Sequence, residues 1–157
     1  MALNLDPERE FRDKLETLKG RCREVGLKLT HQRLEIFREL ALATDHPSAE
    51  AIHKRVQARL PTISLDTTYR TLSTFERYGF VAKVCVLDDR ARFCGDSSLH
   101  HHLLCTRCKS IVDFPWDTFD EVQLPPETEG WGRVNTVRVT LEGICTECLK
   151  QRDHEIV

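Results

Sequence analysis

The sequence has no long apolar run. Its 157 residues contain no stretch of about twenty consecutive apolar side chains, so we expect no membrane span. Residues 1–7 lack the basic stretch followed by an apolar one that marks a secretory leader. The sequence therefore predicts a cytoplasmic protein with no membrane partner.

An excess of basic charge is also absent. The chain has 23 Lys and Arg residues against 25 Asp and Glu residues, a net charge of −2. Residues 1–80 carry 14 basic against 12 acidic side chains, and residues 81–157 carry 9 against 13. Many nucleic-acid-binding domains have a pI above about 9, so any contact with DNA must come from a local basic face.

Cysteine, by contrast, is well represented, and four of the seven cysteines form two Cys-x-x-Cys pairs. The pairs are Cys105/Cys108 and Cys145/Cys148. Each pair offers two thiolates from one tight turn, which suits a tetrahedral zinc ion better than a redox motif or a chance grouping. Because 36 residues separate the pairs, we expect one structural Zn²⁺ per subunit that clamps two distant segments.

Apolar residues recur with a helical period over the first eighty residues. Thr30, Ser48 and Ser64 are expected to cap the second, third and fourth helices, and Gly79 is expected to end the fourth. The positions expected to face a core are Phe11, Leu15, Leu18, Cys22, Val25, Leu34, Phe37, Leu40, Ala41, Ile52, Val56, Leu60, Leu65, Leu72 and Phe75.

After Gly79 the period changes to two, which predicts strands at residues 80–87 and 91–94 joined by a turn. Cys85, in the first of these strands, is expected to be a small core residue. Helices followed by a β-hairpin indicate a winged helix-turn-helix, whose last helix enters the major groove. In residues 64–79 a set of hydroxyls and a guanidinium suits phosphates and base edges, although a solvated polar face is an alternative. This set is Thr67, Thr68, Tyr69, Arg70, Thr71 and Ser73.

Four motifs resemble those of the ferric uptake regulator (Fur) family. They are Gly26-Leu27-Lys28-Leu29-Thr30-x-Gln32-Arg33, His46-Pro47-Ser48-Ala49-Glu50, Ser64-Leu65-Asp66-Thr67-Thr68-Tyr69-Arg70-Thr71-Leu72 and His100-His101-His102-Leu103-Leu104-Cys105-Thr106-Arg107-Cys108. The resemblance runs from about residue 12 to about residue 150. It implies an α+β protein with a winged-helix DNA-binding domain (1–94), a hinge (95–98) and a small α/β metal-binding dimerisation domain (99–157).

The resemblance further implies a homodimeric, metal-dependent repressor that binds a double-stranded DNA operator and is not an enzyme. Tyr69 and Arg70 match the DNA-contacting pair of the recognition helix, and Lys28 matches a lysine that reaches toward the minor groove. The four paired cysteines match the family's structural zinc site. No small organic substrate is expected.

A regulatory site for Fe²⁺, Mn²⁺ or Zn²⁺ is also implied by the resemblance. The matching positions are His46, Cys94, His100, His102 and Asp113. Elementary geometry agrees for the last three, since His100 and His102 lie two apart on a strand and share a face, and Asp113 lies on the next strand.

Cys94 departs from the family pattern. Peroxide-sensing (PerR) members carry aspartate and Fur members glutamate at this position, whereas zinc-sensing (Zur) members place a cysteine there. The resemblance therefore favours an iron- or peroxide-responsive regulator, with a zinc-responsive regulator as the alternative. Cys94 as an unliganded thiol also stays open.

Two other functions compete with this interpretation. A zinc-dependent hydrolase or deaminase could use His100, His102 and Cys94, but the motifs H-E-x-x-H and H-x-E…P-C-x-x-C are absent. A metal-storage protein would leave the DNA-reading helix without a role.

The alternating residues 133–141 predict a strand that pairs in the dimer sheet.

Overall fold

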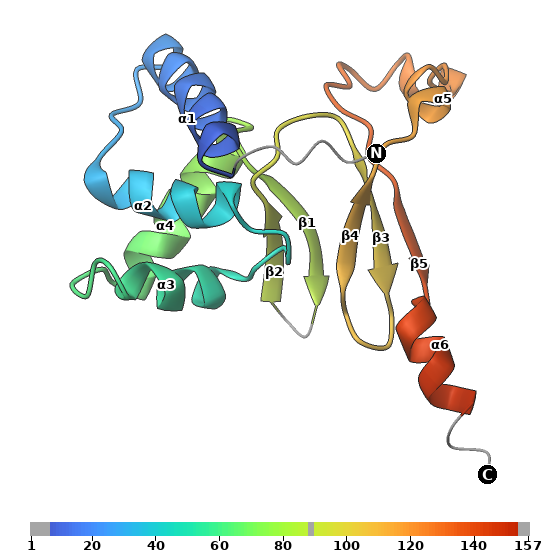
Figure 1. The fold of residues 1–157 in the computed structure, drawn as a ribbon. Coiled ribbons are helices and arrows are strands. Elements are labelled where there is room, and N and C mark those ends of the chain that lie inside the picture. The colour runs from blue at the N-terminus through green and yellow to red at the C-terminus, as the bar shows by residue number, and fades with distance from the viewer. Residues whose placement is uncertain (1–6, 88–89, 154–157) are drawn as a thin grey trace. The chain divides into compact units, whose positions relative to one another are not determined.

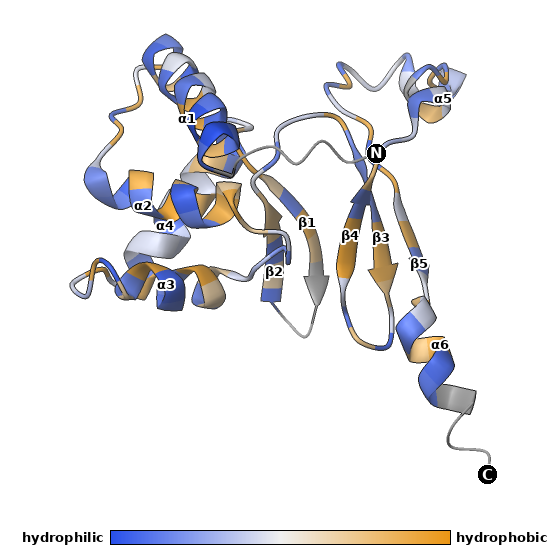
Figure 2. Ribbon diagram, in the orientation of Figure 1, coloured by the Kyte–Doolittle hydropathy of each residue, from blue (hydrophilic) through white to orange (hydrophobic). Residues whose placement is uncertain are grey.

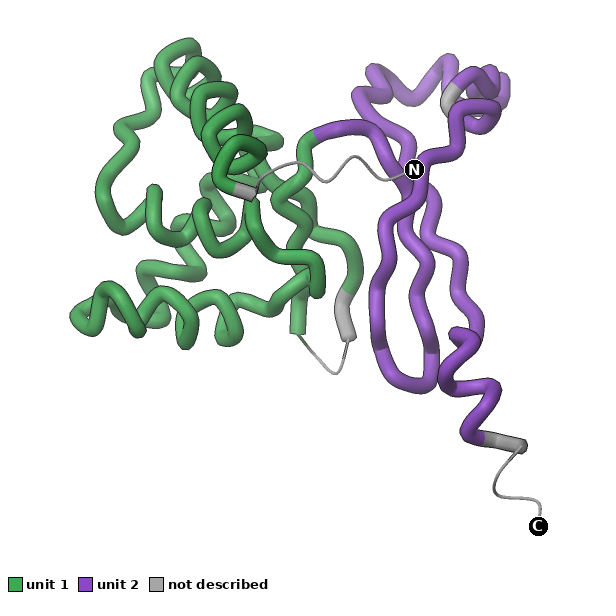
Figure 3. The backbone as a smooth tube through the Cα atoms, viewed as in Figure 1, with its two compact units in different colours: residues 1–97 green, residues 98–157 purple. Residues whose placement is uncertain are grey.

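The computed structural model describes residues 7–87 and 90–153 (Figure 1). The predicted turn at residues 88 and 89, and residues 1–6, lie outside this range. The chain forms two compact units, residues 1–97 and 98–157 (Figure 3). Among the described helices none is long and apolar enough to cross a membrane.

Unit 1 contains four helices and a two-stranded hairpin. The elements are α1 (Pro7–Glu24), α2 (His31–Ala41), α3 (Ala49–Gln57), α4 (Leu65–Arg77), β1 (Ala82–Leu87) and β2 (Arg90–Cys94). The three predicted N-caps are confirmed, because the side chains of Thr30, Ser48 and Ser64 each accept a hydrogen bond from the backbone N–H three residues on. Gly79 follows α4 with φ +67°, a conformation that favours glycine at a helix end.

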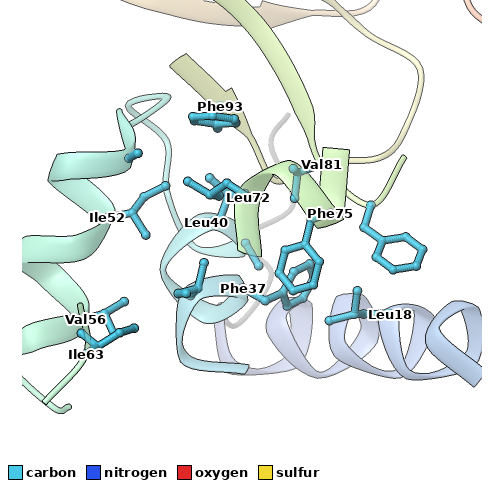
Figure 4. Close-up of a cluster of buried hydrophobic side chains, with 14 of the residues drawn as sticks. Leu18, Phe37, Leu40, Ile52, Val56, Ile63, Leu72, Phe75, Val81 and Phe93 are labelled. Atoms are coloured by element: carbon cyan, nitrogen blue, oxygen red, sulfur yellow. The ribbon is translucent and has the colours of Figure 1, made fainter. Parts of the chain in front are cut away.

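The core of unit 1 lies among the helices, where the apolar side chains of α2, α3 and α4 meet (Figure 4). Ile36, Ile52, Val56 and Phe75 have no exposed surface. Phe75 packs edge-to-face on Phe37, with ring centroids 6.2 Å apart. The helices carry polar residues beside these apolar ones, as expected for elements buried on one side (Figure 2).

Three core predictions are wrong. Val25, just after α1, is 43% exposed, and Leu65, the first residue of α4, is 38% exposed. Both match the apolar period of a helix, but they lie at its terminus, where the side chain does not reach the core. Cys85 is only partly buried, because it lies on the two-stranded hairpin rather than among the helices.

The hairpin is tied to the segment before α3. β1 and β2 are antiparallel, with Ala82 opposite Cys94 and an irregular register between Lys83 and Cys85. The N–H of Phe93 donates to the carbonyl of Pro47 at 3.1 Å. Residues 80 and 81, predicted as strand, instead bury Phe80 and Val81 in the helical core.

Gly95, at the start of the predicted hinge, is packed tightly against α2. A Cβ atom there would lie 2.5 Å from the carbonyl oxygen of Leu40 and 3.0 Å from the nitrogen of Ala41. Only glycine permits this approach. The glycine therefore serves close packing rather than chain freedom.

Unit 2 is built on a three-stranded sheet of order β4-β3-β5, in which β3 is antiparallel to β4 and parallel to β5. Its elements are β3 (His101–Cys105), β4 (Ile111–Phe114), α5 (Asp117–Asp120), the short 3-10 helix η1 (Pro126–Thr128), β5 (Thr140–Gly143) and α6 (Thr146–Asp153). Apolar residues concentrate in β3 and β4 (Figure 2).

Within one chain the predicted strand at 133–141 is present only at its end, and its pairing across a dimer stays a prediction. Only Thr140 and Leu141 belong to β5, and residues 133–139 form no strand. The parallel register places Thr140 opposite His102, so the residues before Val139 extend past the start of β3 at His101 and have no β3 residue to pair with. Val139 accepts a hydrogen bond from the N–H of His102 at 3.0 Å.

Candidate metal centre and nucleic-acid interface

The four paired cysteines form one cluster in unit 2. Their sulfur atoms all lie within 4.8 Å of one another, and Cys108 Sγ is 3.7 Å from Cys145 Sγ. Thiolates bound at about 2.3 Å to a tetrahedral zinc ion are about 3.8 Å apart. The four residues therefore fit a single zinc ion.

The chain builds this cluster by joining two turns that are distant in sequence. After β3 the chain reverses at Lys109, whose φ is +63° and whose N–H donates to the Cys105 carbonyl at 2.9 Å. The N–H of Thr106 donates to the carbonyl of Gly143 at 2.7 Å, which holds the end of β5 beside this turn. The two cysteine pairs therefore meet from segments that are distant in sequence, and zinc binding by them stays a prediction.

The thiols of the cluster differ in acidity. The N–H of Cys145, which donates to Cys105 Sγ at 3.3 Å, is the main reason that the pKa of Cys105 falls to about 6. A hydrogen bond with Ser110 lowers the pKa of Cys108, whereas burial raises the pKa of Cys148 to about 12. Because like charges would crowd here, full ionisation of the cluster requires a cation.

A second group of ligand atoms meets on the opposite face of β3 from His101. His100 Nε2 lies 3.2 Å from His102 Nε2, and Asp113 Oδ1 lies 3.3 Å from His102 Nε2 and 3.7 Å from His100 Nε2. Ligands held at about 2.1 Å by one metal ion are separated by about 3.0–3.4 Å. The 3.2 and 3.3 Å separations fall in this range and the 3.7 Å separation is slightly longer, so the three atoms lie close to the spacing of ligands around one ion.

Local structure orients these side chains as predicted. His102 stands directly opposite Asp113 in the β3–β4 register, so both project from the same face. Nδ1 of His100 donates to the carbonyl of Ser98 at 2.9 Å, since a carbonyl can only accept. That bond fixes the orientation of the ring, in which Nε2 of His100 faces His102 and Asp113.

His101 has a structural role on the other face. It is fully buried, and its ring lies 5.6, 6.1 and 5.3 Å from the rings of Phe114, Trp116 and Phe119. Its Nδ1 accepts a hydrogen bond from the N–H of Val139 at 3.0 Å. The sequence analysis did not predict these ring contacts of His101, although the aromatic residues that follow the first cysteine pair could have indicated them.

The two predicted ligands of unit 1 also lie together. The ligand atoms of His46 and Cys94 are within 4.8 Å of each other, and both residues are buried. His46 adopts φ +47°, which turns the chain so that Pro47 and Ser48 can pair with β2. The turn brings the histidine to the strand that ends in Cys94.

The outer face of α4 presents the predicted DNA-contacting pair. Tyr69 is 43% exposed, and the side chain of Arg70 is 81% exposed and pairs with Asp66 at 2.9 Å. Thr67 is half-buried and shares a 2.8 Å hydrogen bond with Ser64, while Lys28 is exposed in the loop before α2.

Thr68 is a correction, because it has no exposed surface and cannot reach DNA from this position. Its hydroxyl lies 3.4 Å from both His53 Nδ1 and the Ser64 carbonyl, inside the contact between α3 and α4. Thr71 is likewise buried. A run of hydroxyl residues gives no indication of which of them turn inward.

Comparison with known proteins agrees with the fold. Residues 24–142 match the ferric uptake regulator family. The chain is 36% identical over 146 residues to the peroxide operon regulator of Bacillus subtilis, covering 92% of this chain and 97% of that protein. It is 31% identical over 137 residues to the peroxide-responsive repressor PerR of Staphylococcus epidermidis, covering 87% and 91%.

The structure of the ferric uptake regulator Fur of Helicobacter pylori superposes with a TM-score of 0.69 at 22% identity, covering 88% of this chain and 93% of that one. This likeness confirms the predicted α+β combination of a winged helix and a small α/β domain. Together with the family match over residues 24–142, it shows that the chain belongs to the ferric uptake regulator family.

Proposed function

We propose that the protein is a metal-dependent, DNA-binding transcriptional repressor that responds to iron or peroxide. It acts in the cytoplasm as a homodimer on a double-stranded operator. The relatives from B. subtilis and S. epidermidis are named a peroxide operon regulator and a peroxide-responsive repressor, which supports this assignment. Membership of a family of regulators also removes the hydrolase, deaminase and metal-storage alternatives.

The convergence of His100, His102 and Asp113 is the observation that carries the proposal. The two histidines are buried, and their Nε2 atoms lie 3.2 Å apart, each within 3.7 Å of Asp113 Oδ1. We propose that His46 and Cys94 complete this regulatory site around Fe²⁺, Mn²⁺ or Zn²⁺. The bound ion would act as a common electrostatic partner for the thiolate and the carboxylate.

Regulation follows from the placement of the five ligands on the two units. His46 and Cys94 belong to the unit that carries α4, whereas the other three belong to the unit proposed to dimerise. Coordination of an ion by all five residues would restrain one unit against the other and would favour one arrangement of the two α4 helices of a dimer. That arrangement is the one in which both helices reach successive major grooves.

The four-cysteine cluster has a separate role in this scheme. We propose that Cys105, Cys108, Cys145 and Cys148 hold a structural Zn²⁺ that keeps the ends of β3 and β5 together. Binding free energy at such sites adds directly to folding. The cluster therefore maintains the unit on which the regulatory ligands are mounted.

A zinc-responsive repressor is the second candidate, and Cys94 favours it. A thiolate is a softer ligand than the carboxylate of iron-responsive relatives and shifts preference toward zinc. DNA binding by chelator-treated protein, reconstituted at the regulatory site with Fe²⁺, Mn²⁺ or Zn²⁺, tests both candidates. Restoration of sequence-specific binding by Fe²⁺ or Mn²⁺ supports the iron and peroxide assignment, and restoration by Zn²⁺ alone supports the zinc-responsive one.

A further inference from the structure

The hydroxyl of Tyr69 is already engaged within the protein. It donates a hydrogen bond to Oε1 of Glu50 at 2.6 Å, which joins the exposed face of α4 to the first turn of α3. Nineteen residues separate the two side chains, so this is a contact between helices. By contrast, the ion pair of the neighbouring Arg70 with Asp66 lies within one turn of α4, with both side chains largely exposed.

The surroundings of Glu50 favour a carboxylate as the acceptor. The Tyr69 hydroxyl is the main cause that lowers the pKa of Glu50, followed by its own backbone N–H and the Ser48 side chain. The same hydrogen bond raises the pKa of Tyr69. At neutral pH the phenol therefore donates and the carboxylate accepts. The N-terminal turn of α3 also stabilises a negative charge.

This arrangement limits what Tyr69 can do on DNA. A phenol can donate one hydrogen bond, and here Glu50 is its acceptor. The hydroxyl then cannot donate to a phosphate oxygen, and the negative charge beside it repels phosphates. The ring and the oxygen lone pairs remain, and these suit apolar groups and amino groups on base edges.

We propose that Glu50 is a positioning residue that makes Tyr69 read base edges rather than bind phosphates. It holds the phenol in one orientation across the α3–α4 contact and lowers affinity for unrelated DNA. Arg70 is not restrained in this way, because an exposed ion pair within one helix turn contributes little. The inference rests on the proposed function, in which α4 contacts the operator.

The test uses metal-loaded full-length protein and two duplexes. One is selected from a random library by the wild-type protein, and the other is a shuffled duplex of equal length and composition. Affinities for both are measured for Glu50→Ala, Tyr69→Phe and the double variant, together with melting curves. Glu76→Ala removes an exposed carboxylate from α4 and is the charge control for the loss of the half-buried Glu50 of α3.

Glu50→Ala is expected to weaken binding to the selected duplex about two- to tenfold, the usual effect of one hydrogen bond. Binding to the shuffled duplex should be unchanged or tighter, so the specificity ratio falls. In the Tyr69→Phe background the same substitution should no longer weaken binding to the selected duplex. Glu76→Ala should leave the ratio unchanged.

Equal losses on both duplexes together with a lowered melting temperature would mean that Glu50 only supports the fold, and would overturn the inference. An unchanged ratio in Glu50→Ala, or the same loss with and without the Tyr69 hydroxyl, would also overturn it. A library from which the wild-type protein enriches no sequence would contradict the proposed function and this inference with it.

Discussion

His102 and Asp113 face each other across the antiparallel pair β3–β4, with Nε2 of the histidine 3.3 Å from Oδ1 of the aspartate. The histidine is buried, whereas the side chain of the aspartate is 41% exposed. The pair therefore links a buried side chain of β3 to a solvent-exposed side chain of β4. His100 is the third member of the group, and its ring meets that of His102 nearly at right angles, with an interplanar angle of 76°.

Loss of one cysteine ligand should affect folding. Cys145→Ser removes a sulfur that lies 3.7 Å from Cys108 Sγ, and we expect loss of the structural zinc and of the dimer. Apparent zinc-binding free energies at such sites are about 10–16 kcal/mol, so the melting temperature should fall steeply. Metal content by elemental analysis and melting by circular dichroism measure both effects.

Cys22→Ala is the matched control for that substitution, because Cys22 is a buried cysteine of unit 1 and not a member of the cluster. It should keep its zinc and lose only core packing. One zinc per subunit and a wild-type melting curve in Cys145→Ser would show that the cluster is not the structural site.

Loss of the histidines should affect DNA binding without affecting folding. In the His100→Ala/His102→Ala double variant we expect a folded dimer that keeps its cysteine-bound zinc. Operator affinity should fall tenfold or more, on the order of 1.4 kcal/mol. Fluorescence anisotropy with a labelled operator measures the effect, and full operator affinity in this variant would contradict metal control of DNA binding.

Arg70 and Thr68 lie two residues apart on α4, one exposed and one buried, so their substitutions should have different effects. Arg70→Ala removes an exposed guanidinium, so we expect weaker operator binding with unchanged metal content and melting temperature. Thr68→Val removes a buried hydroxyl, at a cost of about 1 kcal/mol, or a fall of about 4–8 °C in the melting temperature of unit 1, residues 1–97. A lower melting temperature in Arg70→Ala, or an unchanged one in Thr68→Val, would contradict these assignments.

Zinc loading of the reduced, metal-free protein should strengthen as pH rises. With the pKa of Cys105 near 6 and that of Cys148 near 12, the first thiol is ionised at pH 7 and the second must lose its proton to bind. Proton release into a weakly buffered solution, followed with an indicator dye, measures this step. Absence of proton release at pH 7 would mean that Cys148 does not bind as a thiolate.

The caps and the grouping of the candidate metal ligands in unit 2 could be predicted from sequence because each depends on local chemistry. Ser48 and Ser64 cap helices through bonds three residues away, and the alternation of a strand is enough to place His100 and His102 on one face. The position of Asp113 opposite His102 required only a tight turn between two strands.

Features that depend on packing between distant segments could not be predicted. The inward direction of Thr68 is set by His53 on α3, and the tight fit of Gly95 is set by the backbone of Leu40. Residues 133–138, before β5, run past the start of β3 at His101, so within one chain they have no strand to pair with, and the predicted pairing needs a second subunit. An alternating pattern shows that a segment can pair, but not whether a partner strand is present.

The proposed response to peroxide is tested most directly by exposing iron-loaded protein to peroxide and mapping the modified residues by mass. Transfer of one oxygen atom from peroxide to the sulfur of Cys94, with release of water, would give a sulfenic acid. We expect added oxygen on His46, His100 or His102, or oxidised Cys94, in step with loss of operator binding. Unmodified ligands, with DNA binding restored only by Zn²⁺, would contradict peroxide sensing and favour the zinc-responsive repressor.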